Sequence, residues 1–230
     1  MAANTRNQLT PGTSLQQLLN SLGSLLTAAL LVSLACANVQ ADDPEKFMAS
    51  IEKQGEAIRA MEPAEQLYQS CIYCHGKAGN AGSSFYPRLA GQPAQYLQQQ
   101  LIAYRDETRK HTIMSSIARI LSPAEIDLLV DYLSAQKPVA AAAGAPAAPA
   151  AIAAGQSRAA ALACVSCHGT NYQGEGVNPR LAGQGREYLV LQLKGFRDGG
   201  RRDATGVMAA LAAGLSDTDI ENLSAYLSQL

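Results

Sequence analysis

Two copies of one signature decide the fold of this chain: Cys71-Ile72-Tyr73-Cys74-His75 and Cys164-Val165-Ser166-Cys167-His168. Each copy has the pattern C-x-x-C-H, which is the attachment motif of a c-type haem. The spacing lets two thiols reach the two vinyl groups of one porphyrin, and it aims the next residue, a histidine, at the iron. We therefore expect two covalently bound haem c groups, each held through the two cysteines of its motif.

The alternative chemistry for a pair of C-x-x-C sites is zinc binding or thiol redox. Both motifs here end in histidine, in a chain that has only three histidines. That coincidence favours haem over zinc.

The composition agrees with small domains built around a large cofactor. The chain has 230 residues, which is room for one large or two small domains. Hydrophobic residues make up 47% of it, but aromatic residues only 5%, and there is no tryptophan. A porphyrin would fill the small cores that such a chain can build. The net charge is -1 and no basic stripe is present, so we expect no nucleic-acid partner.

The N-terminal segment resembles a secretory signal peptide. Residues 7–41 carry no charge, and residues 22–37 form a hydrophobic run that ends in small residues. Ala35-Cys36-Ala37 and Val39-Gln40-Ala41 are two candidate cleavage sites. We expect residues 1–41 to direct export to the periplasm and then to be removed.

Two alternatives for this segment remain open. Residues 18–37 are about long enough to span a bilayer once, so the segment could be retained as an anchor. Lipidation at Cys36 is the other alternative, although Ser33 replaces the leucine that usually begins a lipobox. Either would tether the protein to the inner membrane.

The second major feature is an internal repeat. The two haem motifs are offset by 93 residues, and the segments after them match at nearly the same offset. The matching segments include Pro87-Arg88-Leu89-Ala90-Gly91-Gln92 with Pro179-Arg180-Leu181-Ala182-Gly183-Gln184, Tyr96 with Tyr188, Met114 with Met208, and Ser122 with Ser216. The chain thus contains one domain twice, which we place at residues 63–136 and 155–230.

The remaining segments connect or precede these domains. Residues 137–154 are almost entirely Ala, Pro and Gly, and three prolines interrupt them, so we expect an extended, semi-rigid linker. Residues 42–62 have loose helical spacing of Phe47, Ile51 and Ile58, and we expect a solvated helix that caps the first domain.

Each copy has a helical pattern and no competing strand pattern. Helices are expected at residues 63–74 and 155–167, before each haem motif, and at 93–108 and 185–195. A last helix begins at Ser122, with Glu125 completing a capping box, and again at Ser216 with Asp219. The fold class is therefore all-α, with two tandem small helical domains, each around a haem, joined by an Ala/Pro-rich linker.

The axial ligands of the two irons can be proposed from the sequence. His75 and His168 are the expected proximal ligands, and a backbone carbonyl near Pro87 and near Pro179 is the expected acceptor for the other ring nitrogen. Met208 is the expected sixth ligand of the second iron, because after Tyr172 no other Met, His or Cys follows.

The first domain offers two candidates for the sixth position, Met114 and His111. The equivalence of Met114 with Met208 favours Met114, and His111 is then a surface side chain. A methionine in a helical protein is more often core filler than a ligand. If thioether ligation closes both irons, each haem moves electrons without making bonds.

These residues resemble the dihaem cytochrome c4 family over about residues 65–230. The resemblance rests on the two C-x-x-C-H motifs, the two P-R-L-A-G-Q segments, the two methionines and the paired last helices. It implies two class I cytochrome c domains, haems that meet across the domain interface, and His/Met ligation. It also implies electron delivery from the bc1 complex towards a terminal oxidase, with Arg88, Tyr96, Arg180 and Tyr188 near the propionates or the interface.

Three functions remain to be separated. The first is a periplasmic electron carrier, either free or tethered, that is not an enzyme and has no small-molecule substrate. The second is a dihaem electron-relay subunit of an oxidoreductase such as a thiosulfate or alcohol dehydrogenase. The third is a haem peroxidase, which needs an iron with an open position.

Overall fold

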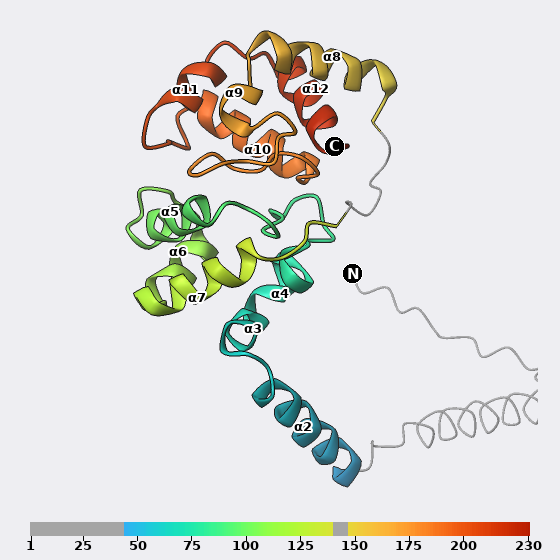
Figure 1. Ribbon diagram of the computed structural model, residues 1–230, viewed down its shortest axis with the longest axis vertical. Helices are drawn as coiled ribbons and strands as arrows, with labels where there is room; N and C mark the ends of the chain where they lie inside the picture. The colour runs from blue at the N-terminus through green and yellow to red at the C-terminus, as the bar shows by residue number, and fades with distance from the viewer. Residues whose placement is uncertain (1–43, 140–146) are drawn as a thin grey trace, which may run out of the picture. The chain divides into compact units, whose positions relative to one another are not determined.

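The structure is a computed structural model that describes residues 44–139 and 147–230, and it contains two compact units (Figure 1). In the first unit the described part is helix α2 (Pro44–Arg59), which has no buried residue. Phe47, Met48 and Ile51 are exposed on it. The predicted solvated helix over residues 42–62 is therefore present, and its predicted capping of the first domain stays a prediction.

The second unit contains both haem motifs. Its first half has α3 (Pro63–Tyr68), a 3-10 turn η1 (Gln69–Cys71), α4 (Ile72–His75) and a second 3-10 turn η2 (Lys77–Gly79). Helices α5 (Ala94–Arg105), α6 (Thr112–Ile120) and α7 (Pro123–Ser134) follow. Helix α7 packs on α3 and α5, and the core between them consists of Tyr68, Leu97, Ile126, Leu129, Val130 and Leu133.

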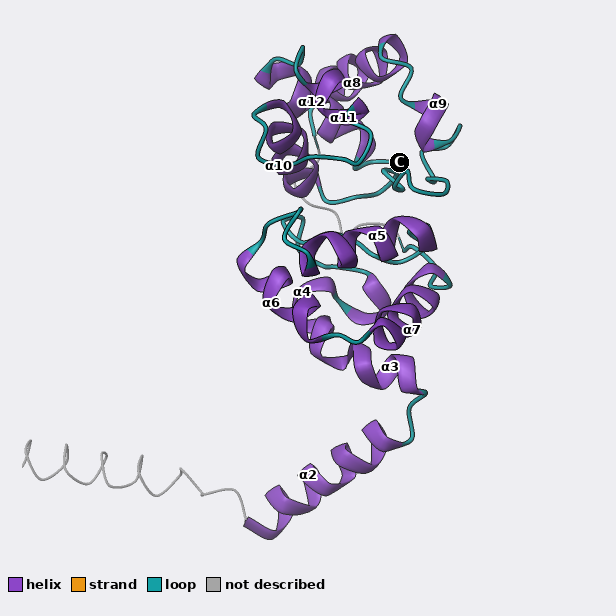
Figure 2. Cartoon of the chain, turned by 90° about the vertical axis from the view of Figure 1, so that its left-hand side faces the viewer, coloured by secondary structure: helices purple, strands orange, loops and turns teal. Residues whose placement is uncertain are grey.

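The second half repeats this arrangement, and helices and loops make up both halves in Figure 2. It has α8 (Pro149–Ala161), α9 (Val165–His168), α10 (Arg186–Arg197), α11 (Val207–Ala212) and α12 (Asp217–Leu227). Helix α12 packs on α8 and α10. The predicted apolar face of the last helix is confirmed in both halves, because Ile220, Leu223 and Leu227 are buried like their counterparts in α7.

The predicted extended linker is wrong at its C-terminal end. Helix α8 begins at Pro149 and not near Gly155, so residues 149–154 are helical. Proline is tolerated in the first turn of a helix, where its missing N–H has no partner to lose, and alanine is the best helix former. Gly155 lies in the middle of α8, where it lets the helix lie directly against α12. Residues 140–146 of the predicted linker are outside the described residues.

The predicted start of the last helix is confirmed in both halves. Ser122 accepts a hydrogen bond from the backbone N–H of Glu125, and the Glu125 carboxylate accepts one from the N–H of Ser122, at 2.8 Å. Ser216 and Asp219 repeat the capping box on α12. These reciprocal bonds satisfy backbone donors that a helix start leaves unpaired.

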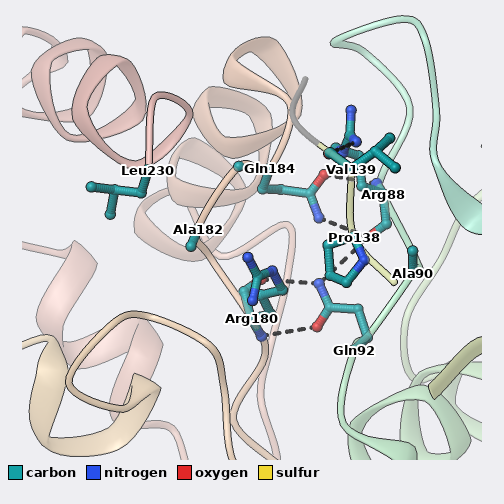
Figure 3. Close-up of a pocket in the computed structure, with 10 residues that line it drawn as sticks. Arg88, Ala90, Gln92, Pro138, Val139, Arg180, Ala182, Gln184 and Leu230 are labelled. Atoms are coloured by element: carbon teal, nitrogen blue, oxygen red, sulfur yellow. Dashed lines mark hydrogen bonds between the residues drawn. The ribbon is translucent and has the colours of Figure 1, made fainter. Parts of the chain in front are cut away.

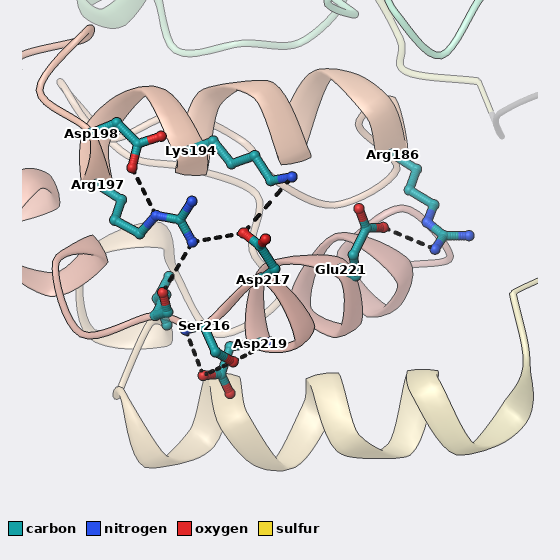
Figure 4. A network of polar contacts seen from close by, with 9 residues as sticks. Arg186, Lys194, Arg197, Asp198, Ser216, Asp217, Asp219 and Glu221 are labelled. Atoms are coloured by element: carbon teal, nitrogen blue, oxygen red, sulfur yellow. Dashed lines mark hydrogen bonds and ion pairs between the residues drawn. The ribbon is translucent and has the colours of Figure 1, made fainter.

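Ion pairs connect α10 to α12 on the outside of the second half (Figure 4). Arg197 contacts Asp217 at 2.8 Å, and Arg186 contacts Glu221 at 3.2 Å. Their side chains are partly to largely exposed, so solvent screens both pairs and they add little to the stability of this half. The buried helix faces therefore hold this half together more than its surface charges do.

The all-α class is confirmed, since the described residues contain no strand beyond one isolated bridge between Glu175 and Asn178. Within residues 44–139 and 147–230, no helix has the length and apolar character that a bilayer span needs. The predicted signal peptide, residues 1–41, lies outside this part of the chain, as does Cys36.

Candidate haem-binding sites

The two motif histidines are held in the same way. His75 ends α4 and His168 ends α9, and both side chains are buried. Nδ1 of His75 lies 3.0 Å from the carbonyl oxygen of Pro87, and Nδ1 of His168 lies 2.8 Å from that of Pro179. A carbonyl only accepts, so Nδ1 carries the proton and Nε2 keeps a lone pair of the kind that coordinates a metal. The predicted acceptors near Pro87 and Pro179 are confirmed.

The surroundings favour the neutral imidazoles that bind metal. Burial lowers the pKa of both histidines, although the hydrogen bonds to Pro87 and Pro179 act in the opposite direction. The Coulomb interaction with His111 lowers the pKa of His75 further. Neutral imidazole is the form that coordinates a metal, so both side chains are prepared as ligands.

A glycine follows each histidine and lets the chain turn away from it. Gly76 has φ 72° and Gly169 has φ 80°, a region that favours glycine. A Cβ on Gly76 would lie 2.2 Å from the carbonyl oxygen of Asn80. No role was predicted for these two positions, although a glycine directly after each motif was the signal available in the sequence.

None of the four motif cysteines, Cys71, Cys74, Cys164 and Cys167, forms a disulfide. Burial raises the pKa of Cys71 and of Cys164 above the ordinary value of a thiol. Each half thus presents two free thiols and one imidazole with an unused nitrogen, from a single short helical segment. This donor set fits a covalently attached haem, with each S–H adding across one vinyl group.

The two methionines lie near the starts of matching helices. Met114 is the third residue of α6 and Met208 is the second residue of α11, and both are half-buried. Met208 packs against the core of its half. No helix was predicted at α6 or α11. Both are short, and α11 begins after Gly206 in a left-handed conformation, which gives no side-chain cap to recognise. That these methionines bind iron remains a prediction.

His111 is exposed and begins helix α6. Its Nδ1 accepts a hydrogen bond of 3.3 Å from the backbone N–H of Met114, so it acts as the N-cap of this helix. This agrees with the surface position expected for His111 in the sequence.

Two arginines from the two halves line a small cavity of about 70 Å³ (Figure 3). Burial lowers the pKa of Arg88 and Arg180, and the charge of Arg180 lowers that of Arg88 further. Nε of Arg180 is buried without a hydrogen-bond partner in the described structure. No acidic side chain lines the cavity. Arg88 is buried and Arg180 is half-buried, and two such cations without a carboxylate partner in the cavity fit the carboxylates of haem propionates.

Hydrogen bonds join the two P-R-L-A-G-Q segments across the interface (Figure 3). Gln184 pairs with both backbone groups of Arg88, accepting from its N–H at 2.7 Å and donating to its C=O at 3.0 Å. Gln92 pairs in the same way with Arg180, at 2.9 Å for both bonds. Both glutamines are buried. The internal repeat identified both segments in the sequence. It did not indicate that the segment of one half contacts the segment of the other.

A second reciprocal cluster joins α5 and α10. Arg109 of the first half donates to the Tyr188 hydroxyl at 3.1 Å and to Gln192 at 2.8 Å. Arg201 of the second half donates to the Tyr96 hydroxyl at 3.2 Å and to Gln100 at 3.3 Å. Such exchange of equivalent contacts is the pattern of a two-fold interface. It places Tyr96 and Tyr188 at the interface, as the family resemblance implied.

A helical domain with C-x-x-C-H thiols and an imidazole oriented by a backbone carbonyl defines a c-type cytochrome domain, and this chain has two. The family model for cytochrome c matches residues 61–137 and 152–230. A cytochrome c-552 of Acidithiobacillus ferridurans is 34% identical over 201 residues, covering 80% of this chain and 86% of the relative. A thiosulfate dehydrogenase electron acceptor of Thiomonas intermedia is 37% identical over 168 residues, covering 69% and 77%.

Among solved structures, the reduced recombinant cytochrome c4 from Pseudomonas stutzeri has a TM-score of 0.66 and 32% identity, over 73% of this chain and 96% of that one. The chain belongs to the dihaem cytochrome c4 family. It carries two covalently bound haem c groups, and it is a dihaem c-type electron carrier.

Proposed function

We propose that this carrier works in the periplasm and passes single electrons between respiratory partners, from the bc1 complex towards a terminal oxidase. In this proposal His75 and Met114 bind one iron, and His168 and Met208 bind the other. The observation that carries it is the matched pair of buried imidazoles, each with Nδ1 fixed on a proline carbonyl. This arrangement leaves one ligand nitrogen in each half at a fixed position.

The chain's own residues account for electron transfer without bond making. When bound, haem supplies an iron that gains and loses one electron. The histidines are buried and fixed at helix ends, so their positions change little with charge, and thioether ligands would close the positions where a substrate binds. The segment 1–41 supports export, and its retention or a lipid on Cys36 would tether the carrier to the inner membrane.

Carbon monoxide tests whether both irons are closed. We expect the reduced protein not to bind carbon monoxide, because Met114 and Met208 occupy the sixth positions. Binding by either haem of the unaltered protein, followed by optical titration, would instead favour a peroxidase.

The Met208→Leu variant tests the second ligand directly. It should keep both haems, lower the potential of the second one and open that haem alone to carbon monoxide, since thioether ligation stabilises ferrous iron. Met48→Leu, on the exposed helix α2, is the matched control and should change neither property. A Met208→Leu protein that still shows two ferric–thioether bands would show that the ligand is wrong.

A relay from an oxidoreductase is the second candidate, because two relatives carry the name thiosulfate dehydrogenase electron acceptor. In that case the purified protein should be reduced when mixed with a thiosulfate dehydrogenase and thiosulfate, and not with thiosulfate alone. Stopped-flow spectroscopy measures this rate. A rate no faster than that with an unrelated dehydrogenase would leave the bc1 complex as the favoured donor.

A further inference from the structure

In each half, one peptide group forms hydrogen bonds to two side chains. Its carbonyl accepts from the proximal histidine, and its N–H donates to a glutamine of the other half. The carbonyl of Pro87, which accepts from Nδ1 of His75, belongs to the same peptide as the N–H of Arg88. That N–H donates to Oε1 of Gln184 at 2.7 Å. A continuous chain of hydrogen bonds therefore runs from His75 through one peptide group to a side chain of the second half.

The same chain exists in the opposite direction. Nδ1 of His168 donates to the carbonyl of Pro179, and the N–H of the same peptide, that of Arg180, donates to Oε1 of Gln92 at 2.9 Å. The carbonyl that accepts from His168 in the second half is thus connected to a glutamine of the first half. In both directions the hydrogen-bond chain runs from one half to the other and does not stay within one half.

The orientation of both amides is fixed by their partners. A backbone N–H can only donate and a carbonyl can only accept, so Oε1 must face the arginine N–H and Nε2 the arginine C=O. Gln92 and Gln184 are only 3% and 4% exposed, which leaves little access for competing water. Gln184 also accepts from the N–H of Gly185 at 2.9 Å.

Hydrogen bonds in such a chain polarise one another. When the peptide N–H donates to a glutamine, its carbonyl becomes a better acceptor for the imidazole proton. A stronger acceptor at Nδ1 makes the imidazole a more basic ligand. A more basic ligand favours the ferric iron, so the glutamine bond should lower the potential of that haem.

We propose that Gln184 tunes the reduction potential of the haem held by His75, and that Gln92 tunes that of the haem held by His168, each across the interface. Both are positioning residues that act through a peptide group. This inference rests on the proposed function for the assignment of the two histidines as iron ligands, and it adds that each haem is adjusted by the opposite half.

The test uses Gln184→Leu and Gln92→Leu in the full chain, with the potential of each haem assigned separately by NMR-monitored redox titration. Gln184→Leu should shift the reduction equilibrium of the His75 haem towards ferrous iron by about two- to tenfold, a smaller factor than the roughly 10- to 100-fold in metal affinity or activity that loss of a direct outer-shell partner costs. The His168 haem should shift less. In Gln92→Leu the His168 haem should shift by this factor and the His75 haem should shift less.

Equal shifts of both haems in both variants would show a loosened interface only and would overturn the proposal. A shift confined to the haem of the altered half, or no shift, would overturn it as well. If the leucine variants do not fold, Gln184→Glu keeps an acceptor for the Arg88 N–H and should lower the potential of the His75 haem selectively. An equal shift of both haems in Gln184→Glu would contradict the proposed hydrogen-bond connection from Gln184 to His75.

A second readout is independent of potentials. Amide hydrogen exchange at Arg88 should quicken in Gln184→Leu, and the Nδ1 proton of His75 should move upfield as its acceptor weakens, while the Nδ1 proton of His168 stays unchanged. An unchanged His75 proton contradicts the relay. Absence of histidine–methionine spectral features from the unaltered protein would instead refute the proposed function. Failure of the proposed function can therefore be distinguished from failure of the glutamine proposal.

Discussion

His111 shows how one side chain near the haem site can serve the helix that carries a proposed ligand. It accepts from the N–H of Met114 and its ring lies edge-on to Tyr104, with 6.4 Å between ring centroids. A cap at this position fixes where α6 begins and therefore where Met114 lies. From the sequence, His111 and Met114 were alternative candidates for the sixth iron ligand. In the structure the His111 side chain caps the N-terminus of α6.

We predict that His111→Ala keeps the ferric–thioether band of the first haem and lowers the free energy of unfolding by about 1 kcal/mol, the usual value of an N-cap. His111→Asn should restore most of that stability, because asparagine is a good N-cap. Optical spectra and guanidinium unfolding measure the two effects. A first haem that shows no thioether band in the unaltered protein and binds carbon monoxide only in the two variants would identify His111 as the ligand.

At the scale of helices, the contact between α8 and α12 depends on Gly155. A Cβ on Gly155 would lie 2.0 Å from the carbonyl oxygen of Asn222, which belongs to the backbone of α12 and cannot move aside alone. The sequence could not reveal this close approach. It placed Gly155 at the start of a helix because the Ala/Pro composition before it resembles a linker, and only packing against α12 explains the additional helical residues.

Gly155→Ala should therefore destabilise the protein, although alanine is the better helix former. Overpacking typically costs about 1–3 kcal/mol. A contact of 2.0 Å with backbone should lie towards the upper end of that range, above the gain of about 1 kcal/mol in helix propensity. Gly214→Ala is the matched control, because nothing lies within 4 Å of the position of its Cβ. Guanidinium unfolding of both variants measures the difference. A Gly155→Ala protein as stable as the Gly214→Ala protein would contradict the proposed close packing of α8.

Other elements were predictable because their signals are local. The capping boxes at Ser122 and Ser216 depend on residues three positions apart, and the buried faces of α7 and α12 follow from helical periodicity. The C-x-x-C-H motif is equally local, and so is the choice of a nearby carbonyl for its imidazole. Contacts between the halves are not local, so the partners of Gln92, Gln184, Arg109 and Arg201 were not predictable.

For the whole molecule, the interface combines buried charge with reciprocal contacts. Arg109 is buried and stacks on Tyr104 at 4.6 Å, and Arg201 lies over Phe196 at 4.4 Å. Hydrogen bonds from charged groups contribute about 1.5–3 kcal/mol each. The two arginines should therefore hold the halves in the arrangement that brings the two haem sites together.

Replacing both arginines, as Arg109→Met with Arg201→Met, should separate the halves without unfolding either. We expect a larger radius of gyration in small-angle X-ray scattering and slower electron exchange between the haems. Arg119→Met is the control, since its ion pair with Glu107 is exposed and contributes about 0–1 kcal/mol. An unchanged radius of gyration in the double variant would contradict this prediction, because the contacts of Gln92 and Gln184 would then be enough to hold the halves together.

The most direct measurement is the intensity of the ferric–thioether charge-transfer band, divided by the haem content of the intact oxidised protein. If a porphyrin is bound covalently in each half and a methionine closes each iron, the band should correspond to two thioether-ligated haems per chain. A band equivalent to one haem or none would contradict the account, because an iron without its methionine could bind a substrate.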